Sequence, residues 1–219
     1  MYSKLQYISQ GTTVAHQLEN IQQALDAGCE WIQLRFKNAS EKELYEVAEK
    51  LKLLCASYKA IFIINDNVEL TKLIDADGVH LGLQDTSPIT ARVILGKDLP
   101  AGKAGKIIGG TANTLIDVMK RVEEKCDYVG LGPFCFTTTK EKLSPILGIE
   151  GYKIIMNELN NSNIHTPIYA IGGITLEDVS TIINTGVYGI AVSGIISRPP
   201  QADKKELVKK IKASLYANT

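Results

Sequence analysis

The chain has 219 residues, which is enough for one large domain or two small ones and for a substantial buried core. Its 24 Lys and Arg balance its 24 Asp and Glu, so the formal charge of zero argues against a protein that binds nucleic acid or a membrane surface. The sequence shows no signal-peptide pattern and no apolar run near the roughly 20 residues of a membrane span, so we expect a cytoplasmic protein. Its four cysteines form no CxxC and no zinc-like spacing, so we expect them to be reduced thiols.

Apolar runs alternate with helical patterns along the whole chain. The predicted strands cover 5–8, 31–35, 61–64, 78–81, 107–110, 128–132, 167–171 and 189–192. The predicted helices cover 14–27, 40–58, 68–74, 87–96, 114–124, 148–159, 176–184 and 204–216. Strict alternation implies parallel strands, and eight such units at this chain length favour a (β/α)₈ TIM barrel, an α/β fold, as a single domain over 1–219. The alternative, an open doubly wound sheet, would normally show a GxGxxG turn after its first strand, and the sequence has none there.

The stretch 61–85 contains two of these strands, and an acid follows each of them. Asn65 and Asp66 come directly after the run 61–64, and Asp85 comes shortly after the run 78–81. Neighbouring parallel strands end at one edge of a sheet, where two carboxylates suit a divalent cation that carries phosphates. Taken alone, Asp66 is better explained as a helix cap and Asp85 as a turn residue.

The end of the second strand carries cations that suit an anionic substrate. Gln33, Arg35 and Lys37 alternate, so in an extended strand all three would point to one side. The guanidinium of Arg35 could bind phosphate oxygens as a fork, and a solvated strand end is the alternative. His80, in the fourth strand, either lines the pocket wall or is a satisfied core histidine.

Three later segments also suit phosphate. The loop after the sixth strand offers three hydroxyls and a cation at 137–140, with a flexible solvated loop as the alternative, and the segment 133–147 is long and polar enough for a lid. Gly172-Gly173 and Ser193-Gly194 follow the last two strands, where many barrels bind phosphate through backbone N–H groups. The alternative is that these glycines only turn the chain.

Six segments stand out when the chain is taken as a whole: QLRFK at 33–37, INDNVEL at 64–70, DADGVHLGLQD at 75–85, GPFCFTTTK at 132–140, LGIEG at 147–151 and AIGGI at 170–174. They span almost the whole chain, and together they resemble the thiamine-phosphate synthase family, also called thiamine-phosphate pyrophosphorylase. The resemblance implies a (β/α)₈ barrel. It also implies an enzyme that joins 4-amino-2-methyl-5-hydroxymethylpyrimidine diphosphate to a hydroxyethylthiazole phosphate, giving thiamine phosphate and diphosphate.

The resemblance also implies roles for individual residues. The pyrimidine diphosphate would contact Gln33, Leu34, Arg35, Phe36, Lys37, Asn65, His80, Thr111 and Lys140. The thiazole phosphate would contact Thr137, Thr138, Thr139, Gly173 and the turn at Val192, Ser193 and Gly194. Asp66 and Asp85 would hold one Mg²⁺ per subunit. Two departures from the family occur: Thr111 replaces the usual serine but keeps the hydroxyl, and the turn AVSG is one residue short, which leaves its contact among Val192, Ser193 and Gly194 open.

The implied chemistry agrees with the residues. Arg35, Lys37 and Lys140, together with Mg²⁺, would neutralise the departing diphosphate, and the thiazole nitrogen would then attack the pyrimidine carbon. That attack needs no general base, and the sequence shows no Ser-His-Asp or Cys-His constellation. If the thiazole carries a carboxylate, it is lost as CO₂. The partners are therefore small molecules, and a homo-oligomer is left open.

Three rival functions are less consistent with the sequence. A thiazole tautomerase related to this family uses a histidine two residues after the hydroxyl position, where this chain has Asn113. A non-catalytic binding barrel would have no need of Asp66, Asp85 and Lys140 around a leaving group. A sugar-phosphate isomerase would need a general base, for which only His80 is a candidate.

Overall fold

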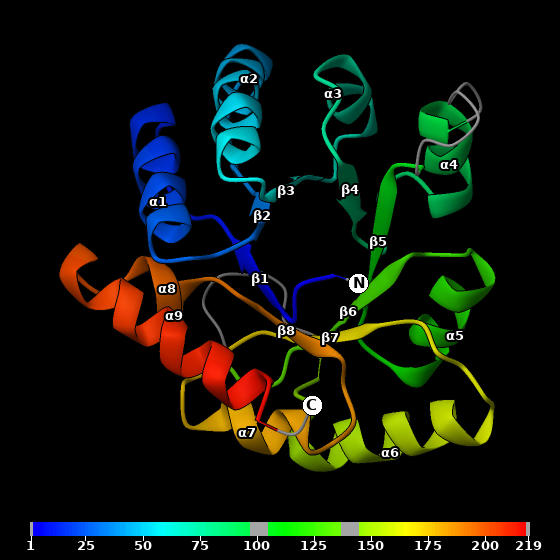
Figure 1. Ribbon diagram of the computed structural model, residues 1–219. Helices are drawn as coiled ribbons and strands as arrows, with labels where there is room; N and C mark the ends of the chain where they lie inside the picture. The colour runs from blue at the N-terminus through cyan, green and yellow to red at the C-terminus, as the bar shows by residue number, and fades with distance from the viewer. Residues whose placement is uncertain (1, 97–104, 137–144, 218–219) are drawn as a thin grey trace.

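Eight parallel strands form a closed barrel in the order β1-β2-β3-β4-β5-β6-β7-β8. The computed structural model describes residues 2–96, 105–136 and 145–217. The strands are β1 (Leu5–Ile8), β2 (Trp31–Leu34), β3 (Ile61–Asn65), β4 (Gly78–Leu81), β5 (Ile107–Ala112), β6 (Tyr128–Leu131), β7 (Ile168–Ile171) and β8 (Gly189–Val192). The helices are α1 (Val14–Asp26), α2 (Glu41–Ser57), α3 (Val68–Leu73), α4 (Pro88–Gly96), α5 (Leu115–Glu123), α6 (Gly148–Asn161), α7 (Asp178–Ile183), α8 (Gly194–Ser197) and α9 (Gln201–Leu215). Figure 1 shows the helices arranged around the strands.

Pairing of the first and last strands closes the sheet. In register, Leu5 lies opposite Ile190 and Tyr7 opposite Val192. The predicted barrel is therefore confirmed, and the open doubly wound alternative is wrong. Among the described residues, no helix combines the length and apolar character needed to cross a bilayer.

Each predicted strand and helix is present, but some bounds differ. β2 ends at Leu34, one residue earlier than predicted, whereas β5 continues through Thr111 to Ala112. The four-residue helix α8 was not predicted, because so short a segment has no measurable helical periodicity. The predicted helix start at Ser40 is confirmed, since its side chain and that of Glu43 form a reciprocal capping box.

The core has two layers, one outside the sheet and one inside it. Outward-facing strand residues pack against the helices in a large apolar cluster that includes Leu34, Val129 and Ile190. Inside the barrel, Trp31, Tyr128 and Tyr169 form edge-to-face pairs with ring centroids 4.9 to 5.6 Å apart. These rings lie near the N-terminal ends of the strands and close the barrel floor, which leaves the C-terminal ends as the mouth.

Candidate active site

Four polar side chains from neighbouring strands, Gln33, Asn65, His80 and Thr111, line one side of the barrel mouth. The strand register places Asn65 opposite His80, and each lies at or near the C-terminal end of its strand. Gln33 Nε2 donates to Asn65 Oδ1 at 2.7 Å, and His80 Nε2 lies 3.0 Å from Thr111 Oγ1. The family resemblance assigned all four to one ligand, and the fold brings them together.

Gln33 has an unmet hydrogen-bonding capacity at this mouth. The residue is only 2% exposed, and its Oε1 is buried with no hydrogen-bond partner among the described residues. A buried acceptor without a partner is rare and costs about 1–3 kcal/mol. A ligand that brings an N–H or O–H donor would satisfy it.

The backbone of Arg35 is held on both sides by residues that precede it in the chain. Its N–H donates to Ser9 Oγ at 2.9 Å, and its carbonyl accepts from Gln17 Nε2 at 3.2 Å. Gln17 Nε2 also donates to the carbonyl of Gly11, at 3.0 Å, so α1 and the loop before it are tied to the end of β2. Ser9 and Gln17 were not singled out in the sequence; Ser9 comes directly after β1, and Gln17 lies in the first turn of α1.

The predicted alternation of Gln33, Arg35 and Lys37 on one face of a strand is wrong beyond Leu34. The strand stops there, and the chain turns through Lys37 and Asn38, which has φ of 59°. Lys37 is consequently exposed, and Arg35 and Phe36 are half-buried. Leu34 points into the outer core, so only its backbone is available to a ligand.

Asp66 and Asp85 meet at the same rim, as predicted from the strand order. Their carboxyl groups share a hydrogen bond, and Asp85 Oδ2 also accepts from the N–H of Gly82 at 2.7 Å. Although Asp66 as a whole is exposed, desolvation of its carboxyl raises its pKa to about 7, with the hydrogen bond and charge of Asp85 adding to the effect. The charge of Arg35 acts in the opposite direction.

Asp66 is not the cap of α3. The cap is Asn67, whose side chain accepts from the N–H of Leu70 at 2.8 Å. Asp66 instead has φ of 65°, a left-handed conformation that Asp tolerates better than most residues, and its N–H donates to the His80 carbonyl at 2.8 Å. The helix-cap alternative for Asp66 is therefore wrong, whereas Asp85 does form a turn contact with Gly82.

The pair of carboxylates fits a divalent cation whose coordination is completed by other groups. Two acids that must share a proton form a donor set in which a cation could replace that proton. The described residues contain no group of three or more His, Cys, Asp or Glu that could hold a metal. A two-carboxylate site suits Mg²⁺, which keeps waters and substrate phosphates as further ligands.

His80 is bonded through both ring nitrogens inside the barrel. It is 6% exposed, and its Nδ1 lies 2.9 Å from the Tyr128 hydroxyl, while its Nε2 faces Thr111. This arrangement agrees with the satisfied core histidine, and it makes His80 a poor general base for a sugar-phosphate isomerase. Asn113 likewise has a structural contact, since its amide donates to the carbonyl of Gly132.

The opposite side of the mouth is built by close contact between two loops. Gly172 and Gly173 have φ of 93° and 70°, and the carbonyl of Gly172 accepts from the N–H of Cys135 at 3.0 Å. A Cβ at Gly173 would lie 2.6 Å from the carbonyl oxygen of Phe136. These glycines therefore do more than turn the chain: they let the end of β7 lie directly against the loop that follows β6.

The turn after β8 leads into α8, a short extra helix at the place where many barrels bind phosphate. Ser193 Oγ donates to the Ile8 carbonyl at 2.6 Å, which ties β8 to β1. Val192 is buried in the outer core, so Ser193 and Gly194 are the residues of this turn nearer the mouth. The predicted contacts at Thr137, Thr138, Thr139 and Lys140 lie outside the described residues.

Comparisons with known proteins show which family the whole chain belongs to. A family model described as thiamine monophosphate synthase matches residues 5–196. A thiamine-phosphate synthase from Flavobacterium johnsoniae is 56% identical over 218 residues, covering 100% of this chain and 99% of that protein. One from Phocaeicola vulgatus is 48% identical, covering 94% and 96% of the two chains. The structure of a thiamine phosphate pyrophosphorylase from Pyrococcus furiosus matches with a TM-score of 0.79 at 30% identity, covering 97% and 96%.

Proposed function

Because the chain belongs to the thiamine monophosphate synthase family, we propose that it joins 4-amino-2-methyl-5-hydroxymethylpyrimidine diphosphate to a hydroxyethylthiazole phosphate. The products are thiamine phosphate and diphosphate, which places the enzyme, a transferase, in thiamine biosynthesis. The observation that carries the proposal is the clustering of the Gln33–Asn65 amide pair and the Asp66–Asp85 carboxyl pair on one rim. One pair suits a pyrimidine and the other a metal-bound diphosphate.

The amide pair would bind and orient the pyrimidine. Because Gln33 Nε2 already donates to Asn65, its unpartnered Oε1 is free to accept from an amino group on the ligand. The Thr111 hydroxyl lies on the same side of the mouth and offers a further polar contact. Several convergent polar groups in an otherwise apolar barrel are what fix the orientation of a small ligand.

The cations would stabilise the leaving group. The C–O bond to diphosphate breaks, its electron pair departs with the oxygen, and the pyrimidine methylene carbon is left as a cation. Arg35, whose backbone is held by Ser9 and Gln17, would meet the departing negative charge, and so would Lys37 on the adjacent turn. Asp66 and Asp85 would hold Mg²⁺, which when bound neutralises charge on the diphosphate. By the family resemblance, Lys140 would add a further positive charge.

The thiazole would approach from the other side of the mouth. The Gly173 turn and the start of α8 are proposed to hold its phosphate, and the ring nitrogen then donates its lone pair to the carbon cation. No proton is transferred in this step, so no general base is required. A carboxylated thiazole would lose CO₂ as its carbon–carbon electron pair returns to the ring.

The proposal can be tested by measuring diphosphate release by the purified protein with both substrates and Mg²⁺. Release that requires both substrates and Mg²⁺, together with thiamine phosphate detected by mass spectrometry, is expected. A reaction with only the carboxylated thiazole would identify that substrate. A folded protein that releases no diphosphate with either thiazole would contradict the proposal.

A further inference from the structure

A continuous chain of hydrogen bonds crosses the interior of the barrel from floor to mouth. Gln6 Nε2 donates to the Tyr128 hydroxyl at 3.1 Å, and that hydroxyl lies 2.9 Å from His80 Nδ1. His80 Nε2 lies 3.0 Å from Thr111 Oγ1. The four residues come from β1, β6, β4 and β5, so the chain links strands on different sides of the barrel.

Two glycines make room for these side chains. A Cβ at Gly109 would lie 2.2 Å from Tyr128 Cζ and 2.5 Å from its hydroxyl, so any other residue would displace the phenol. A Cβ at Gly130 would lie 3.1 Å from His80 Cε1. Because these two positions on β5 and β6 have no side chain, the Tyr128 ring and the His80 ring can occupy the space beside them.

The polar chain is costly to bury unless its members are paired. Gln6, Tyr128 and His80 are at most 6% exposed, in a barrel interior that is usually filled by branched apolar residues. Burying such a polar group without a partner is strongly unfavourable, whereas a fully paired network is rigid. Of the four residues, only Thr111 is partly exposed, so the network ends at the mouth.

The direction of each hydrogen bond follows from its donors. Gln6 Nε2–H donates to the Tyr128 oxygen, and His80 Nδ1 is the other partner of that hydroxyl among the described residues. The buried phenol proton is therefore satisfied only if it is donated to Nδ1. His80 then carries its proton on Nε2 and donates to Thr111 Oγ1. Because that oxygen accepts from His80, the Thr111 proton is left to be donated to another acceptor.

We propose that Gln6 and Tyr128 are positioning residues that hold His80 in its Nε2–H tautomer and thereby make Thr111 a hydrogen-bond donor to the pyrimidine diphosphate. The identity of the acceptor, an oxygen or ring nitrogen of that substrate, rests on the proposed function. In the other tautomer, with the proton on Nδ1, the Thr111 hydroxyl would donate its proton to His80 Nε2. Only a lone pair of the Thr111 oxygen would then face the substrate, and a lone pair repels an anion. A diphosphate oxygen or a pyrimidine nitrogen needs the donor.

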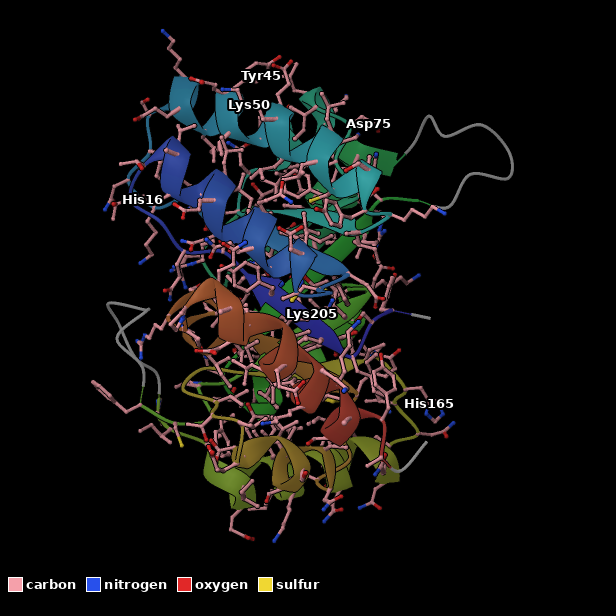
Figure 2. The ribbon with its side chains drawn as sticks, turned by 60° about the vertical axis from the view of Figure 1, so that its left-hand side comes forward. His16, Tyr45, Lys50, Asp75, His165 and Lys205 are labelled. Carbon is pink, nitrogen blue, oxygen red and sulfur yellow. The ribbon has the colours of Figure 1, made fainter. Side chains whose placement is uncertain are left out.

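The first test measures the tautomer of His80 directly, without substrate. Long-range ¹H–¹⁵N spectra of labelled protein distinguish a protonated Nε2 from a protonated Nδ1. The chain has three histidines, and His16 and His165 are exposed on opposite sides of the molecule, far from the barrel interior, so their signals serve as internal references (Figure 2). His80 is expected as the Nε2–H tautomer, and its signals are assigned from their loss in His80→Gln.

The second test compares two buried tyrosines of the barrel floor. Tyr128→Phe removes the hydroxyl that fixes His80, whereas Tyr169→Phe removes a buried hydroxyl that donates to the Ser3 carbonyl at 2.8 Å. Both rings keep their packing against Trp31. Tyr128→Phe should give a mixture of His80 tautomers and raise KM for the pyrimidine diphosphate about ten-fold, with KM for the thiazole phosphate unchanged. Tyr169→Phe should change neither.

A double-mutant cycle shows whether Tyr128 acts through Thr111. Thr111→Ser keeps the hydroxyl and should retain activity, whereas Thr111→Val should lose about as much as Tyr128→Phe. In the Thr111→Val protein, adding Tyr128→Phe should cost almost nothing more. Fully additive effects would show that Tyr128 has a general structural role and would overturn the proposal.

The outcomes also separate this proposal from the proposed function. An Nδ1–H tautomer of His80 in the unmodified protein would overturn the inference, whatever the activity. A protein that shows the Nε2–H tautomer but couples no substrates would contradict the proposed function instead. In that case, binding of the pyrimidine diphosphate by calorimetry to Thr111→Val and Thr111→Ser would still decide the role of the hydroxyl.

Discussion

Gly173→Ala should disrupt the contact that joins the β7 turn to the loop after β6. At this position a Cβ would lie 2.6 Å from the carbonyl oxygen of Phe136 and 2.8 Å from that of Cys135, and both are backbone atoms that cannot rotate away. The residue also has φ of 70°, a region that L-residues other than Asn and Asp rarely adopt. Two separate costs are therefore expected, one from backbone conformation and one from steric contact.

Gly186→Ala provides a matched control for the first cost. Gly186 has φ of 94°, but the nearest atom to an added Cβ is Met156 Cε at 3.9 Å, an ordinary contact distance. A positive φ costs a non-glycine residue about 1–2 kcal/mol, so Gly186→Ala should lower the free energy of unfolding by that amount. Gly173→Ala should lose about 1–3 kcal/mol more, because forcing an atom into a packed contact costs that much.

Denaturant unfolding of the two variants, monitored by circular dichroism, measures this difference. In thermal melts, each kcal/mol should lower Tm by about 2–4 °C in a chain of this size. If Gly173 also holds the thiazole phosphate, its variant should raise KM for that substrate at least ten-fold, whereas Gly186→Ala should leave KM unchanged. Equal stabilities for the two variants would refute the steric argument, and an unchanged KM would refute the role in binding.

Three further predictions concern the other side of the mouth. Desolvation raises the pKa of Asp66 to about 7, so below that pH Mg²⁺ must displace a proton to bind. The apparent Mg²⁺ affinity, measured by calorimetry, should therefore rise about ten-fold per pH unit up to pH 7 and then level off. A flat profile, or one unaffected by Asp85→Asn, would contradict this. Asn67→Ala removes the helix cap, so it should cost about 1 kcal/mol of stability and leave kcat unchanged. Asp66→Asn should lower kcat by orders of magnitude and leave Tm unchanged. The reverse result would show that Asp66 is the cap. Ser9→Ala should raise KM for the pyrimidine diphosphate several-fold, because the Arg35 N–H loses its acceptor, and an equal rise for the thiazole would indicate a general loss of structure.

The barrel itself could be predicted because its signals are local and repeated. Each strand is an apolar run and each helix has a periodic face or a cap, as at Ser40, so strict alternation was enough to predict parallel strands. The meeting of Asp66 and Asp85 followed from the same logic, since neighbouring parallel strands end at one edge. The alternation of strands and helices is therefore enough to predict which residues lie at the strand ends that form the mouth.

The contacts that position the site could not be predicted in the same way. Arg35 is held by Ser9 and Gln17, which lie 26 and 18 residues earlier in the chain, and nothing in their local sequence indicates that contact. The end of β2 at Leu34 could not be predicted either. Its last pair is with Ile64 of β3, and the chain then turns through Lys37 and Asn38 instead of continuing along that strand. Such long-range contacts depend on tertiary packing and become visible only in the folded chain.

The division of roles between Asp66 and Asn67 illustrates how a functional group is kept available. A helix after a strand needs a capping side chain, and Asp would meet that need as well as Asn. Here Asn67 caps α3, and the left-handed conformation of Asp66 turns its carboxyl away from the helix and toward Asp85. Asp tolerates that conformation and can also ligate a cation, so in this Asn-Asp-Asn run one side chain is proposed to contact the pyrimidine and one to hold a cation, while the third caps the helix. A sequence pattern that suggests only capping can therefore conceal a carboxylate that the backbone reserves for a ligand.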